Sequence, residues 1–318
     1  MKRREFLQKI WNDSFGVLPP GTHVAVAGGG LAGLHLAEAL LQRGLRVTLY
    51  EPQCIGGVRI PLMHACQTPK LRGAFWENAA AFSRTRYEQL MASGYLIRAT
   101  DSAFGRYYAV NARSLARRLT DRLCRAGLVI RRQPFFESEA QNYDGHFLAT
   151  GARFLPGEKS PLLRATQIVP GHASYATGVN VKEGIVLPPR AEFVHLRDAT
   201  PAAAKAEALQ VFAGKRSFLF HGQRLVTRDR LPAIGFYPPA GENSYDELRL
   251  TFLKKNYAAD SLAQKSPFLF QGMGYHVLTY APFLAAAVAA WLTGADKMDE
   301  NLICNLSPTR FLYRNARR

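Results

Sequence analysis

Four residues near the start of the chain have the types and spacing that bind a diphosphate. Gly28, Gly30 and Gly33 form a G-x-G-x-x-G pattern, and Glu51 follows 18 positions after Gly33. In nucleotide-binding turns the first glycine permits the tight turn and the second lets the backbone approach a pyrophosphate. The third lets the helix pack closely on the strand. An acid about 20 residues further on binds a ribose 2′-hydroxyl, which favours FAD or NAD over NADP.

The residues around this pattern predict the elements that must position it. Val24 and Val26 lie in an apolar run typical of a buried parallel strand, and a helix follows that ends at Gly44. Residues 47–50 predict the next strand, which Glu51 ends. The start of the helix has free N–H groups and a partial positive charge, so it suits a diphosphate. The alternative is a glycine-rich turn in an α/β protein that binds no ligand.

Two further motifs place glycine at the end of an apolar strand. Residues 144–152 predict an apolar strand that ends in Ala149–Gly151, where the glycine lets the backbone approach a ligand closely. Gly272–His276 lies between a strand at 268–270 and a helix at 278–292. This second helix start can stabilise negative charge that develops on a bound ring. The alternative for Gly272–His276 is a purely structural glycine turn.

Composition narrows the class of protein. The 318 residues are 47% hydrophobic, enough for one large domain or two modest ones. The four cysteines are far apart and contain no C-x-x-C pair, which argues against a disulfide framework or a zinc site. We therefore predict no metal and a reducing compartment, the cytoplasm. The sequence has no uninterrupted run of 18 apolar residues, so we predict no transmembrane helix.

The net charge of +17 predicts an anionic partner. Residues 111–127 predict a helix with leucines on one face and arginines around the rest. Further basic residues cluster at both ends of the chain, where Arg310 begins the basic tail. This charge is compatible with a surface that binds nucleic acid or an anionic membrane. It is also compatible with a basic surface that is merely solvated. The arginines predicted to form the nucleic-acid surface include Arg113, Arg117, Arg118 and Arg122.

The order of the motifs predicts a mixed α/β fold: a Rossmann-like dinucleotide-binding domain with an inserted, mainly antiparallel β domain for the substrate. We expect a basic arm at 1–20, the first part of the nucleotide domain at 21–170, and the substrate domain at 171–265. The chain then returns to the nucleotide domain at 266–318 and ends in a basic tail. Within the insert, residues 185–187, 192–195 and 217–220 predict strands, and 199–212 predict a helix.

With these motifs, the chain resembles the FAD-dependent D-amino-acid oxidase/glycine oxidase superfamily. Within it, the chain is most similar to the FAD oxidoreductase domain of the bifunctional enzymes that make 5-methylaminomethyl-2-thiouridine in tRNA. Thr227–Pro232, reading T-R-D-R-L-P, is the most distinctive link to that branch. The other matching stretches are Gly28–Gly33, Val47–Glu51, Pro61–Met63, Phe75, Ala81–Leu90, Gly222–Arg224, Ile234–Gly235 and Gly272–Pro282.

The resemblance implies non-covalent FAD and oxidation of a C–N bond in a glycine-like secondary amine. On a tRNA wobble uridine the reacting group would be carboxymethylaminomethyl, with hydride passing to the flavin and the imine hydrolysing. Arg224 matches the arginine that clamps the substrate carboxylate in glycine-oxidase-like members, and a planar guanidinium suits that task. His276 is the other candidate catalytic residue. A structural salt bridge for Arg224 and a packing role for His276 stay open.

The resemblance and the motifs together assign a set of cofactor contacts. They are Gly28, Gly30, Leu31, Ala32, Gly33, Glu51, Gly57, Arg59, Ala149, Thr150, Gly151, Gly272, Met273, Gly274, Tyr275 and His276. The chain departs from the superfamily in its short length, in its compressed segment between 186 and 222, and in lacking a methyltransferase domain. Two alternative functions therefore stand beside the tRNA enzyme. One is an FAD oxidase or dehydrogenase of a free amine or amino acid, and the other is a non-catalytic flavin-bound RNA-binding protein.

Overall fold

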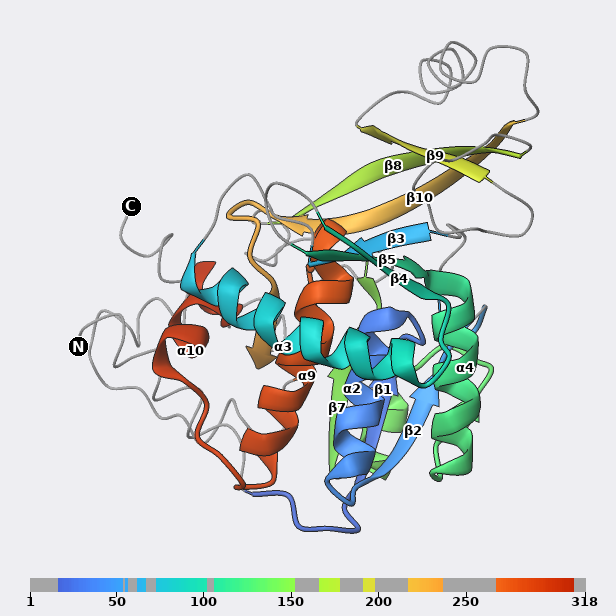
Figure 1. The fold of residues 1–318 in the computed structure, drawn as a ribbon. Helices are drawn as coiled ribbons and strands as arrows, with labels where there is room; N and C mark the ends of the chain where they lie inside the picture. Colours follow the sequence, from blue (N-terminus) through green and yellow to red (C-terminus); the bar gives the residue numbers. More distant parts are fainter. Residues whose placement is uncertain are drawn as a thin grey trace.

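The computed structural model of the chain (Figure 1) describes nine segments of the backbone. For residues 166–177, 191–197 and 217–224, and for a few single residues including Tyr275, the description is of the backbone alone. The described segments are residues 17–53, 55–56, 62–66, 73–101, 106–151, 166–177, 191–197, 217–236 and 267–311.

A six-stranded sheet forms the centre of the molecule, in the order β11-β12-β7-β1-β2-β6. All neighbours are parallel except β11 and β12. β1 lies between β2 and β7, and Val24, Ala25 and Val26 at its centre are fully buried. The run H-V-A-V-A therefore forms a strand covered on both faces, as parallel strands usually are. The strands are β1 (His23–Ala27), β2 (Arg46–Tyr50), β6 (Val129–Arg131), β7 (Gly145–Leu148), β11 (Ala233–Phe236) and β12 (Phe268–Gln271).

Helices cover this sheet and share its core. α2 packs against α9 and α4, while α3 crosses α9 on the outer side (Figure 1). In α4 the leucines at 115, 119 and 123 are buried, and the arginines lie around the rest of the helix, as its sequence predicts. The helices are α2 (Leu31–Gln42), α3 (Ala74–Ala92), α4 (Ala112–Arg125), α9 (Val277–Leu292) and α10 (Glu300–Leu306), with short 3-10 turns η1 (Glu137–Asn142) and η3 (Gly274–His276).

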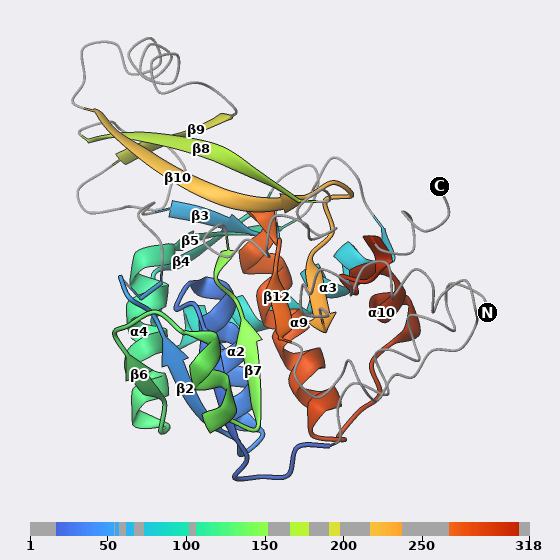
Figure 2. The same cartoon turned by 180° about the vertical axis from the view of Figure 1, so that it is seen from behind.

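Two antiparallel sheets lie beyond the carboxyl ends of the parallel strands (Figures 1 and 2). The nearer one has the order β3-β5-β4, and the farther one has the order β10-β8-β9. Ligands of open α/β folds bind at this edge of the sheet, so both antiparallel sheets border the expected site. The strands are β3 (Leu62–Ala65), β4 (Ile97–Thr100), β5 (Tyr107–Asn111), β8 (Thr166–Thr177), β9 (Ala191–Arg197) and β10 (Ser217–Thr227).

This architecture confirms the predicted mixed α/β fold with a mainly parallel sheet and antiparallel additions. The expected strands at 192–195 and 217–220 are parts of β9 and β10, and the expected helix at 278–292 is α9. The expected strand at 185–187 and helix at 199–212 lie outside the described residues. β11 belongs to the central sheet although its sequence lies within 171–265, and the domain boundaries stay a prediction.

Pro282 interrupts the hydrogen bonding of α9 one turn after the helix begins. Proline has no N–H to donate to the carbonyl four residues earlier, which is that of Leu278. The Tyr87 hydroxyl of α3 donates to this carbonyl oxygen instead, at 2.8 Å. The Ser83 hydroxyl donates to the next one, Thr279 O, at 2.7 Å. Two hydroxyl groups of α3 thus hold the start of α9, the part that faces the expected site.

Candidate dinucleotide-binding site

The first glycine turn, residues 28–33, needs glycine because of its backbone conformation and its close packing. Gly28 has φ +106°, a conformation that residues with a side chain rarely adopt. Its N–H donates to Tyr50 O of β2 at 2.8 Å, which fixes the turn to the neighbouring strand. A Cβ added to Gly33 would lie 1.9 Å from Gly28 O. Helix α2 can therefore approach β1 only because position 33 has no side chain.

The structure brings the first and second motifs into direct contact. A Cβ on Gly28 would lie 2.5 Å from Ala149 O and 2.9 Å from Thr150 N. The Ala149 N–H donates to Ala27 O at 2.7 Å and so continues the pairing of β1 with β7 past the strand end. Gly28, Ala149 and Thr150 therefore lie together at the carboxyl edge of the sheet, and Gly151, the next residue, has φ +61°.

Open space faces the start of α2. A Cβ added to Gly30 would meet no atom within 4 Å, in contrast to Gly28 and Gly33. Gly30 is the N-cap of α2 and has no side chain with which to cap the helix, and the first turn contains no acid. Leu31 and Ala32 then begin the helix, packed into the core. A helix start without a cap, next to open space, has the geometry of an anion-binding site.

Glu51 lies behind this turn with its carboxylate fixed by backbone. The Gly29 N–H donates to Oε2 at 2.9 Å and the Gln53 N–H donates to Oε1 at 2.9 Å. A Cβ on Gly29 would lie 2.8 Å from Glu51 Cβ, so the two residues pack without room for a side chain at 29. The ribose contact of Glu51 stays a prediction.

The second glycine turn, residues 272–274, lies at the end of β12. Gly272 and Gly274 have φ +78° and +53°, and Met273 between them is buried. Met273 forms an isolated bridge with Val226 of β10, so the turn is attached to the far antiparallel sheet. His276 is half-buried, donates its N–H to Met273 O at 3.1 Å, and lies with its ring 5.3 Å from that of Tyr280. α9 begins directly after it, again without a side-chain cap.

Two polar side chains near the ends of β7 and β12 are buried without a partner. Thr150 Oγ1 is inaccessible to solvent and has no hydrogen-bond partner among the described residues, and the same is true of both amide atoms of Gln271. Leu148 of β7 pairs with Leu269 of β12, and Thr150 and Gln271 each follow two residues later. A buried polar group without a partner is costly, so this strand edge fits a ligand that donates and accepts hydrogen bonds. Sequence reasoning missed Gln271, although a polar residue ends the otherwise apolar strand F-L-F-Q.

Two of the arginines predicted for a nucleic-acid surface have partners within the protein. Arg122 forms an ion pair with Glu38 of α2, which also pairs with Arg86 of α3. Burial alone would raise the pKa of Glu38, but His35 and the two guanidinium groups lower it. Arg118 donates to Gly94 O and lies over the Tyr95 ring at 4.3 Å.

Arg118 and Arg122 thus have partners within the protein, and the basic surface predicted on α4 stays a prediction. Arg86 and Arg122 together balance the buried carboxylate of Glu38. Arg113 and Arg117 are exposed. Arg310, counted with the basic C-terminal tail, is a correction, since its side chain is fully buried and pairs with Asp229.

Several predicted site residues are only partly described. Gly57 and Arg59 lie outside the described residues, and so does the side chain of Tyr275. Arg224 is described by its backbone alone, which pairs with Val169 two residues before the bridge from Val226 to Met273. Two residues of strand span about 7 Å, so Arg224 is close to the second glycine turn along the chain.

No group of three or more His, Cys, Asp or Glu side chains gathers in the described segments. Among the same segments, none of the helices is both long and apolar enough to cross a bilayer.

No family model matches the sequence. One curated relative is 30% identical over 98 residues, the tRNA 5-methylaminomethyl-2-thiouridine biosynthesis bifunctional protein of Shewanella baltica. The match covers 29% of this chain and 14% of the relative. The chain thus matches only a small part of a much longer protein.

Solved structures give a broader match that establishes the fold. Glycine oxidase from Bacillus cereus has a TM-score of 0.57 at 13% identity, covering 90% of this chain and 98% of that one. Iminodiacetate oxidase from Chelativorans has 0.55 at 14%, covering 87% and 96%. An FAD-dependent oxidoreductase from Pseudomonas aeruginosa has 0.53 at 16%, covering 88% and 92%. The resemblance predicted from the sequence is therefore confirmed at the level of the fold, the glycine oxidase fold.

Proposed function

We propose that the chain is an FAD-dependent oxidoreductase that oxidises the CH–NH bond of an amine or amino acid. The observation that carries this proposal is the contact of Gly28 with Ala149 and Thr150 beside the open space at Gly30. This contact joins two motifs into one cradle at the start of α2, where a diphosphate is bound by N–H groups and the helix dipole. The fold that surrounds the cradle is one in which an FAD-dependent oxidoreductase has been solved.

The residues of the cradle fit the parts of FAD. Gly30, Leu31 and Ala32 would hold the pyrophosphate, and Glu51 would accept a hydrogen bond from the ribose. Thr150, Gln271 and the second glycine turn would face the flavin, whose ring edge carries both donors and acceptors. When bound, FAD would accept a hydride, with its two electrons, from the carbon next to the amine nitrogen. The chain's own residues bind the coenzyme and orient the substrate.

We further propose that the substrate carries an N-carboxymethyl amine, most specifically the carboxymethylaminomethyl group of a tRNA wobble uridine. Arg224 would clamp the carboxylate, since a guanidinium binds a carboxylate through two parallel hydrogen bonds and fixes its orientation. One structural neighbour is named for iminodiacetate, an amine that carries two carboxymethyl groups. The curated relative is named for tRNA thiouridine biosynthesis. His276, beside the second turn, would contact the flavin or the substrate.

Charge supports a tRNA substrate over a free amino acid. A free amino acid needs no polyanion surface, whereas the chain has a net charge of +17 and exposes Arg113 and Arg117 on α4. An oxidase of a free amine and a flavin-bound RNA-binding protein without catalysis are the competing functions. The cytoplasm remains the predicted location under each of them.

The cofactor proposal is tested by titrating the purified protein with FAD and following absorbance and flavin fluorescence. Gly30→Ala should fold as stably as the wild type within about 1 kcal/mol, because its Cβ enters open space. The same methyl group should weaken FAD binding about a hundredfold, because it occupies the approach of the pyrophosphate. Gly73→Ala is the matched control, since Gly73 is also an N-cap glycine with no atom within 4 Å of an added Cβ.

Equal FAD affinity for Gly30→Ala and Gly73→Ala would place the pyrophosphate elsewhere. A wild-type protein that stays colourless with excess FAD, and gains no thermal stability from it, would refute the cofactor itself.

The substrate proposal is tested with anaerobic protein loaded with FAD. Bleaching of the flavin by tRNA that carries carboxymethylaminomethyluridine, but not by glycine or sarcosine, is the expected result. Binding of that tRNA should weaken steeply with salt, and Arg113→Ala with Arg117→Ala should reduce the salt slope by about two. Lys297→Ala, at an exposed cation between α9 and α10, should leave it unchanged. Bleaching by free amines alone would favour the amine oxidase, and no bleaching by any amine would favour the RNA-binding protein.

A further inference from the structure

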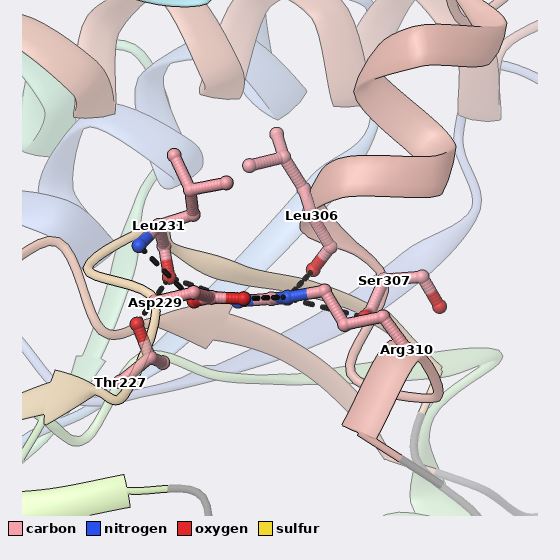
Figure 3. A network of polar contacts seen from close by, with 6 residues as sticks. All are labelled: Thr227, Asp229, Leu231, Leu306, Ser307 and Arg310. Atoms are coloured by element: carbon pink, nitrogen blue, oxygen red, sulfur yellow. Dashed lines mark hydrogen bonds and ion pairs between the residues drawn. The ribbon is translucent and has the colours of Figure 1, made fainter. Parts of the chain in front are cut away.

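A buried arginine far along the sequence is attached to the loop of the T-R-D-R-L-P motif (Figure 3). Arg310 is fully buried, and its Nε and Nη2 donate to the two carboxylate oxygens of Asp229 at 2.9 and 3.0 Å. Nη2 also donates to Leu231 O at 3.0 Å, while Nη1 donates to Leu306 O at 2.6 Å and Ser307 O at 3.1 Å. One guanidinium thus connects the end of α10 to residues 229–231.

The loop that Arg310 holds has a defined shape. Arg230 has φ +60°, a conformation that is strained for a residue with a side chain. The Thr227 hydroxyl donates to Leu231 O at 2.6 Å and closes the loop upon itself. Strain of this kind persists only where the surroundings hold it, and the paired carboxylate of Asp229 lies next to the strained residue.

This loop forms one wall of the second glycine turn. A Cβ on Gly272 would lie 3.3 Å from both Thr227 Cγ2 and Ala233 N. The backbone on each side of the loop is also joined to the turn, since Val226 bridges Met273 and Ala233 pairs with Gln271. A continuous set of contacts therefore runs from α10 through Arg310 and Asp229 to Gly272, although neither charged group touches the turn itself.

We propose that Arg310 and Asp229 are positioning residues for the flavin end of the cofactor site. The proposal rests on the proposed function, because it assumes that the turn at 272–274 faces FAD. Removing the pair would let the loop 227–232 move away from Gly272. The turn would then lose the packing contact that fixes its backbone conformation. The coenzyme would then bind less tightly and in a less uniform environment. A pair that serves stability alone would change the folding of the apoprotein and leave the bound coenzyme as it is.

The double variant Asp229→Leu with Arg310→Met separates these two roles. The double variant removes both buried charges together, so neither is left unpaired. It also removes the donor to the carbonyls of Leu231, Leu306 and Ser307, so the apoprotein should lose stability, as the Leu123→Ala control below also does. FAD should nevertheless bind about tenfold more weakly, as is usual when a supporting partner of a bound group is lost. The absorption maximum and visible circular dichroism of the bound flavin should also shift. Arg310→Lys, which keeps the charge and loses the two-pronged contact, should shift the same spectrum in the same direction.

Leu123→Ala is the control, because Leu123 is buried in α4 and its removal lowers stability without touching the loop. It should leave FAD affinity and the flavin spectrum unchanged. Wild-type affinity and spectrum in the double variant would overturn the positioning role while the proposed function stands. If the double variant fails to fold, an unshifted spectrum in Arg310→Lys overturns it in the same way. Failure of the wild-type protein to bind FAD would overturn the proposed function and this inference together.

Discussion

The two glycine turns of the molecule are held in place by different means. At the first turn, Gly28 and Gly33 touch backbone atoms of residues 28, 149 and 150. At the second, Gly272 touches a loop whose shape depends on Asp229 and on Arg310, 38 positions further along the chain than Gly272. A turn closed by backbone can be recognised from its glycines alone. A turn closed by side chains from elsewhere shows little of its construction in its own sequence.

The largest effect that tests this difference is expected from alanine at the two turns. Gly33→Ala places a Cβ 1.9 Å from Gly28 O, and neither backbone can yield without separating α2 from β1. We expect a loss of about 4 kcal/mol or more in the free energy of unfolding, enough to prevent folding. Gly274→Ala places a Cβ in open space and should cost only about 1 kcal/mol, from its positive φ.

Urea unfolding followed by circular dichroism measures both alanine variants. Equal losses at positions 33 and 274 would show that the second turn is as closely packed by backbone as the first.

A smaller effect is expected from acid at the second turn. Burial alone would raise the pKa of Asp229, but its bonds with Arg310 lower it below the ordinary value. A carboxyl whose folded pKa is lowered adds stability above its unfolded pKa, near 4, and loses it as the pH falls through the folded value. Asp229→Asn should therefore lower the free energy of unfolding by about 3 kcal/mol at pH 7. The difference from the wild type should shrink below pH 4 in urea unfolding at a series of pH values. A difference that does not depend on pH would mean that the carboxylate charge is unimportant there.

The smallest effect is expected at the helix that follows the second turn. Tyr87→Phe leaves Leu278 O without its donor. Pro282 cannot replace this donor, because proline has no N–H. The expected cost is about 1 kcal/mol, measured by thermal unfolding. Tyr108→Phe is a suitable control, because the Tyr108 hydroxyl donates to Glu88 and does not contact α9. A Tyr87→Phe variant as stable as the wild type would mean that the carbonyl finds another donor.

Local patterns predicted the elements around the first turn and the strands and helix around the second. Strand β1, helix α2, strand β2 and helix α9 follow the apolar spacing of their own residues, so each could be predicted from a short window. The contact between Gly28 and Ala149 could also be predicted from the sequence, because parallel strands of one sheet bring their carboxyl ends together.

Features that depend on distant partners could not be predicted in the same way. Arg122 forms an ion pair with Glu38, which lies 84 residues earlier in the chain. Arg310 is buried and is not part of a basic tail. Arg310 lies in a basic stretch of sequence, where composition suggests exposure. The role of Gln271 depends on an unfilled hydrogen-bonding requirement, which only the packed structure makes visible.

The place of β12 between β7 and β11 has a consequence for the order in which the chain assembles. During synthesis β1, β2, β6 and β7 emerge first, and β7 then remains a bare sheet edge for more than a hundred residues. Exposed edges of this kind invite pairing with other chains. The nascent protein should therefore be most vulnerable to aggregation, and most dependent on chaperones, in the interval before residue 271 leaves the ribosome.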